Sequence, residues 1–109
     1  MSLTTEILPQ WLPLARAGIR GVSVQVLLTT DHLHLAQLAF QPNATIDEHG
    51  AAHPIDVICL EGSGYTSIAG ERLPLRAGQK VHWPAGQPHR LWTGLDQMKT
   101  LMVEHTREQ

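Results

Sequence analysis

The sequence contains a single cysteine, Cys59, so it cannot form a disulfide within the chain. This excludes a small secreted scaffold held together by disulfides. Cys59 lies inside the apolar run "DVICLEG", where a small buried side chain is expected rather than a nucleophile. No apolar run approaches the roughly 20 residues that a membrane-spanning helix needs, and the first residues lack the pattern of a signal peptide. We therefore expect a soluble cytoplasmic protein without a membrane partner.

Lysine is scarce: only Lys80 and Lys99 are present, no basic run occurs, and the net charge is −2. A nucleic-acid partner therefore has no electrostatic support. Seven histidines stand against these two lysines, which is a reason to look for histidine chemistry. With 109 residues, 42 % of them hydrophobic, the chain suits one domain with one core.

No segment repeats its apolar residues with the period of a helix, whereas strand patterns recur between turn signals. Residues 19–30 and 32–40 alternate across the short turn "TTD" and predict a hairpin. Residues 41–47 are expected to form a loop in which Asn43 takes a left-handed conformation. Residues 1–18 are expected to be an irregular arm, whose Trp11 and Leu14 cover an open barrel edge or a partner subunit. The barrel domain would then be residues 19–109.

Further strands are predicted for residues 54–64 and for a hairpin turning at Ala69–Gly70–Glu71. Residues 79–86 are predicted as a strand that ends at a corner, 89–97 as a strand and turn, and 98–105 as the last strand. The regular spacing of turns favours an all-β sandwich or barrel. The stretch "GQKVHWPAGQPH" (78–89) ends one of these strands at a stiff corner. Pro84 fixes its φ angle and ends strand pairing, and Gly86 permits unusual backbone angles. A rigid turn of this kind fixes where His89 points.

This stretch resembles the second conserved motif of the cupin superfamily. Gly78, Pro84, Gly86 and His89 match that motif in type and spacing, while Thr93 replaces its final asparagine. The resemblance is to small single-domain cupins of the cupin 2, RmlC-like type. It implies an all-β double-stranded β-helix, or jelly-roll barrel, that assembles as a homodimer.

The first cupin motif resembles "NATIDEHGAAHPIDVICLEG", from Asn43 to Gly62. In this frame His49 falls on the first metal-binding histidine of the family, Ala51 on the second, and Ile55 on the glutamate. The resemblance therefore implies a site that keeps two histidines, His49 and His89, and has lost the only carboxylate.

His53 is a candidate replacement ligand, because positions 49, 51, 53 and 55 share a face if the strand is regular. The alternative is that His53 lies in a loop and faces solvent. His82, two residues before Pro84, is a second candidate, although it could equally be a packing or hydrogen-bonding residue. Glu48 and Asp56 have the wrong parity to join His49. An all-histidine site would suit iron, zinc, nickel or copper.

Two functions follow most directly. In the first, the altered site binds a transition metal together with a small molecule, as in a metal-dependent enzyme. The other is a metal-free module that binds or senses a small molecule in a more apolar barrel. A third, a metal-free enzyme with a histidine as general base, lacks an obvious acid partner. Trp83, Trp92 and Tyr65 either grip a ligand at the barrel mouth or belong to the core or a dimer interface.

Overall fold

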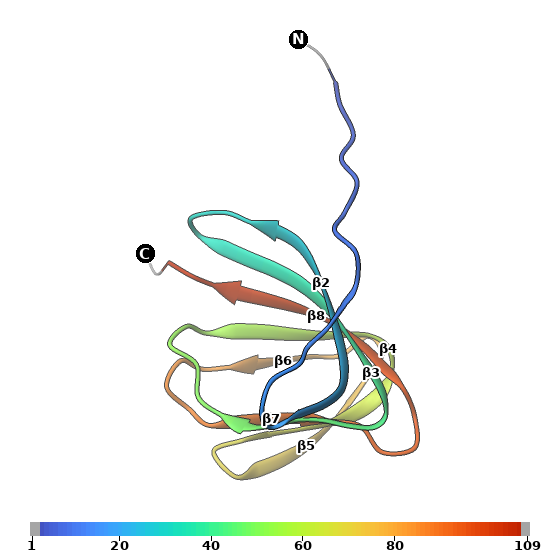
Figure 1. The fold of residues 1–109 in the computed structure, drawn as a ribbon. Coiled ribbons are helices and arrows are strands. Elements are labelled where there is room, and N and C mark those ends of the chain that lie inside the picture. Colours follow the sequence, from blue (N-terminus) through green and yellow to red (C-terminus); the bar gives the residue numbers. More distant parts are fainter. Residues whose placement is uncertain (1–2, 108–109) are drawn as a thin grey trace.

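The computed structural model describes residues 3–107, in which every regular element is a strand. The strands are β1 (Leu12–Pro13), β2 (Ile19–Thr29), β3 (Leu33–His49), β4 (Ile55–Ile68), β5 (Glu71–Arg76), β6 (Lys80–Trp83), β7 (His89–Trp92) and β8 (Met98–His105). They pair antiparallel in the order β1-β2-β3-β7-β4-β5, while β6 pairs with β4 and β8 with both β3 and β4. The result is a closed barrel (Figure 1), which confirms the predicted all-β architecture. Over the described range, no helix is long and apolar enough to cross a membrane.

The two longest strands close the barrel because each changes partner along its length. The first half of β3 pairs with β8 and its end with β7, while β4 pairs first with β6 and β8 and then with β5 and β7. The predicted loop at residues 41–47 was wrong, because β3 continues through it. Asn43 has a φ of 57°, as expected, and its N–H donates to the carbonyl of Gly94. The left-handed residue thus bends the strand without ending it.

The predicted hairpin between β4 and β5 is confirmed. Its turn is Ala69–Gly70, with φ angles of 49° and 84°. Two successive positive φ angles are the mark of the tight turns that match strand twist. At Gly62, which has a positive φ angle, a side chain would collide with the carbonyl oxygen of Gln97.

The core fills one part of the barrel and leaves another part open. Its fully buried members include Phe40, Val57, Cys59, Trp83 and Leu91. Burial raises the pKa of the Cys59 thiol, so this side chain behaves as the small buried hydrophobe that was predicted. Apolar burial of this kind supplies most of the driving force for folding.

The N-terminal segment extends away from the barrel and meets it only as it approaches β1 (Figure 1). Leu3 and Ile7 are almost fully exposed. Contact with the barrel begins where the Gln25 side chain donates to the carbonyl of Pro9, and it continues through the short strand β1. Leu14 packs against the core, whereas Trp11 remains 37 % exposed.

Candidate functional site: a histidine pair at the end of an apolar cavity

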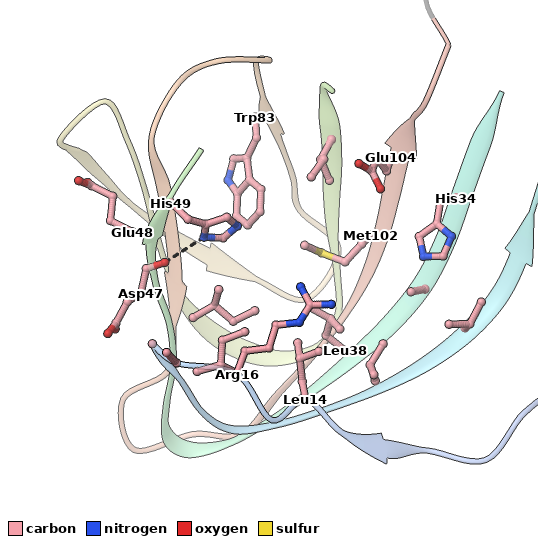
Figure 2. A pocket seen from close by; sticks show the side chains of 18 residues that line it. Leu14, Arg16, His34, Leu38, Asp47, Glu48, His49, Trp83, Met102 and Glu104 are labelled. Carbon is pink, nitrogen blue, oxygen red and sulfur yellow. Dashed lines mark hydrogen bonds between the residues drawn. The ribbon is translucent and has the colours of Figure 1, made fainter. Parts of the chain in front are cut away.

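The open part of the barrel is a cavity of about 600 Å³ (Figure 2). Its wall is mainly apolar and comes from β2, β3, β4, β6, β8 and the segment before β2. The apolar lining side chains are Leu14, Ala17, Ile19, Val24, Val26, Ala36, Leu38, Ile46, Ile55, Trp83 and Met102. A cavity of this size and composition is typical of small-molecule sites.

A histidine pair lies beside Trp83 at one end of the cavity. His49 ends β3, His89 begins β7, and the two residues are register partners. Their Nε2 atoms are 3.2 Å apart. His49 lines the cavity, while His89 lies behind it with 0 % of its surface exposed and its ring stacked on Trp83 at 3.9 Å. The pair therefore joins the cavity to the core.

The corner between β6 and β7 holds His89 in place. Gly86 has a φ of 77°, and its N–H donates to the carbonyl of Ala51. Thr93, which stands where the cupin motif has asparagine, is also buried. Its hydroxyl accepts from the N–H of Ala44 and donates to the carbonyl of Gln41. Both ends of β7 are thus tied to β3 or to the segment that follows it.

The hydrogen bonds of the two rings define their tautomers. Nδ1 of His49 lies 2.9 Å from the carbonyl of Asp47, and Nδ1 of His89 lies 3.2 Å from the carbonyl of Gln87. A carbonyl only accepts, so each Nδ1 must carry the hydrogen. In neutral rings both Nε2 atoms then present lone pairs to each other. A proton on one Nε2, or an ion between them, removes this conflict.

Burial, together with the neighbouring charge of His49, lowers the pKa of His89 to about 4. His89 is therefore neutral at neutral pH, and its Nε2 presents a lone pair toward Nε2 of His49, the atom on the cavity side.

The two further metal ligands suggested by the sequence lie elsewhere. His53 belongs to the connection 50–54 between β3 and β4, which is not a strand. The alternation of strand side chains on which the prediction depended therefore does not apply to it. His53 does not line the cavity. His82 points to the outer face and is 51 % exposed, with Nδ1 2.9 Å from Asp56 Oδ1. Among residues 3–107, no three His, Cys, Asp or Glu side chains form a group that could hold a metal ion.

Ile55 and the three aromatic residues considered in the sequence differ in their relation to the cavity. Ile55 lines the cavity at the position of the family glutamate, so an apolar group replaces a carboxylate there. Trp83 belongs to the core and closes the cavity end. Tyr65 and Trp92 instead stack on each other, and neither lines the cavity. Of the three aromatic residues, only Trp83 can contact a bound molecule.

The sequence did not single out Arg16, although it lines the cavity. It lies in the segment that was interpreted as an irregular arm. Its position depends on the two-residue pairing of β1 with β2 and on a turn in which the N–H of Ile19 donates to the carbonyl of Arg16. No periodicity or motif in the sequence marks such a short contact.

The cupin-domain family model matches residues 37–104, which include both histidines and half of the residues that line the cavity. The chain belongs to the cupin family. It is therefore a small cupin of the cupin 2 type, as the two motifs predicted, and its solved neighbours include RmlC-like cupins.

Three solved structures illustrate the likeness. The polyketide cyclase RemF from Streptomyces resistomycificus is 20 % identical with a TM-score of 0.82, over 90 % of this cupin and 74 % of that chain. KdgF from a Halomonas species is 16 % identical with a TM-score of 0.81, over 92 % and 90 %. An RmlC-like cupin from Shewanella frigidimarina is 19 % identical with a TM-score of 0.78, over 91 % and 86 %. At these identities the likeness shows the fold alone. No curated protein matches the chain.

Proposed function

We propose that this cupin binds a small, mostly apolar organic molecule in the barrel cavity, with the His49–His89 pair as the polar contact at its inner end. The observation that supports this proposal is the cavity itself, about 600 Å³ with an apolar wall and a histidine pair at one end. Binding sites for small molecules combine such walls with a few placed polar groups.

The pair gives the ligand a definite chemical partner. With a proton on Nε2, His49 can donate a hydrogen bond to a carbonyl or hydroxyl oxygen, and without it the same atom accepts one. His89 keeps its Nδ1–H bonded to the carbonyl of Gln87 and stays neutral, so it can take up the hydrogen bond when the ligand leaves.

A transition-metal ion is a second candidate occupant, because both Nε2 lone pairs converge. At a metal–nitrogen distance of about 2.1 Å, the separation of 3.2 Å corresponds to a ligand angle of about 100°, between the tetrahedral and octahedral values. Two imidazoles suit iron, zinc, nickel or copper. His49 and His89 would hold the ion, and it would supply a Lewis acid at the cavity end. With only two protein ligands, such an ion would bind weakly.

Mass spectrometry of tag-free protein, purified without chelators, tests both occupants. Native spectra report a carried organic molecule, and elemental analysis reports metal. We expect an organic ligand that is lost in Ala36→Phe, which fills the cavity, and kept in Ala52→Phe, which adds the same ring on the exposed connection. Metal would be lost in His49→Ala and kept in His82→Ala. If neither occupant binds, even after candidate ligands and metals are offered, the proposal fails.

A further inference from the structure

Arg16 places a positive charge at the wall of a mainly apolar cavity, which His34, His49 and three carboxylates also line. It lies between β1 and β2 and is one of the cavity-lining residues. Figure 2 shows its side chain crossing the cavity, with the guanidinium directed toward Met102 and away from solvent-facing Asp47 and Glu48. The charge therefore lies where a ligand bound beside Leu38 and Met102 would contact it.

The guanidinium of Arg16 has no hydrogen-bond or ion-pair partner among residues 3–107. Arg16 is exposed at the cavity wall, and its guanidinium carries five donors in a planar fork that no described protein group uses. The other exposed arginine near this segment, Arg20, does not line the cavity. Arg16 is thus the arginine available to a bound molecule.

The acidic residues around the cavity do not serve this arginine. Asp47 accepts from the hydroxyl of Thr45 and lies 4.0 Å from Nε of Arg90. Glu48 directs its carboxylate away from the cavity (Figure 2). Glu104 lies on β8 as the register partner of His34, and no ion pair joins it to Arg16. A ligand can therefore supply the missing anion.

We propose that the ligand of this cavity is an apolar carboxylate whose acid group pairs with Arg16. This inference rests on the proposed function and adds the chemical class of its ligand. The planar fork matches a carboxylate in a bidentate arrangement. The apolar body of the ligand packs on the cavity wall, and any oxygen at its far end reaches His49.

Three matched probes test the charge: octanoate, octanamide and octylamine share one chain and differ in the head group. Binding is followed by NMR shift titration of the full chain. We expect octanoate to bind most tightly and to lose affinity at higher salt, because the contact is partly exposed. Arg16→Gln should weaken octanoate about three- to tenfold, as expected for a charge-assisted hydrogen bond in a partly exposed site, and should leave octanamide unchanged. Arg20→Gln, an exposed arginine outside the cavity, is the control.

The outcomes separate the two proposals. If octanamide or octylamine binds as tightly as octanoate, or Arg16→Gln behaves as Arg20→Gln does, the carboxylate proposal is overturned while the cavity still binds a ligand. If octanoate also binds Ala36→Phe, Arg16 holds the acid outside the cavity, and the proposal is again overturned. If no probe binds at all, the carboxylate proposal is overturned, and the proposed binding function fails with it only if mass spectrometry of the purified protein also finds neither an organic ligand nor a metal.

Discussion

One histidine cluster faces the inside of the barrel and another faces its outer surface, and their surroundings differ. Inside, His49 and His89 face each other with no carboxylate between them. Outside, Asp56 joins β6 to β8: its Oδ1 is 2.9 Å from His82 and its Oδ2 is 2.7 Å from His105. In the outer cluster both oxygens of Asp56 accept from histidine rings. In the inner pair the two Nε2 atoms face each other, and in neutral rings neither has a hydrogen to donate. The outer cluster therefore has the role of joining strands, whereas the inner pair keeps a ring nitrogen available to a ligand.

The sharpest way to separate the clusters is to remove one histidine from each. His89→Ala should lower the free energy of unfolding by about 2–4 kcal/mol, since it removes a fully buried ring stacked on Trp83 and leaves a hole. His82→Ala should cost at most about 1 kcal/mol, because its hydrogen bond to Asp56 is solvent-exposed. Urea unfolding at pH 7 measures both values. Equal costs would mean that burial does not distinguish the two clusters.

Mild acid should act on the inner pair first. The folded state keeps His89 neutral down to its pKa of about 4, whereas the unfolded chain protonates this histidine near pH 6.5. Between these values the unfolded state binds more protons, so stability falls as the pH falls through this window. We expect a loss on the order of 2–3 kcal/mol from this residue.

Urea unfolding of the wild type and His89→Gln at pH 7 and pH 4.5 measures this loss. The glutamine variant should start less stable and lose less on acidification. An identical pH dependence in the two proteins would show that His89 does not titrate as its burial requires.

The outer cluster should respond in a different pH window. Burial alone would raise the pKa of Asp56, but hydrogen bonds from His105, His82 and Lys80 lower it well below its ordinary value. Asp56 therefore contributes stability that is present above its unfolded pKa of about 3.9, and this contribution is lost as the pH falls further.

Asp56→Asn should cost about 1–2 kcal/mol at pH 7, a value discounted for the partial exposure of the cluster. The difference from wild type should shrink below about pH 3.9, as unfolding curves across this range would show. A difference that persisted unchanged into acid would mean that the charge of Asp56 is not what joins the strands.

The comparison also shows which features a sequence can predict. The corner motif from Gly78 to His89 and the alternation of the strands suffice for the all-β barrel, and they bring His49 and His89 to one place. The parity argument failed for His53 because it assumed a regular strand, while residues 50–54 form a connection. His82 lies on the outer face, where it hydrogen-bonds to Asp56. Arg16 was missed because its position depends on tertiary pairing of the arm, which leaves no local pattern.

The smallest expected effect concerns the displaced candidate His53. Because it lies outside the cavity, His53→Ala should leave both stability and metal-induced stabilisation within about 0.5 kcal/mol of the wild type. His49→Ala, its matched partner from β3, should remove the stabilisation that nickel or copper gives to the wild type, since binding to the folded state raises apparent stability. Thermal melting with and without metal compares the two variants. If His53→Ala were the variant that lost the metal response, the connection 50–54 would have to close onto the cavity when metal binds, and the metal site would be larger than the histidine pair.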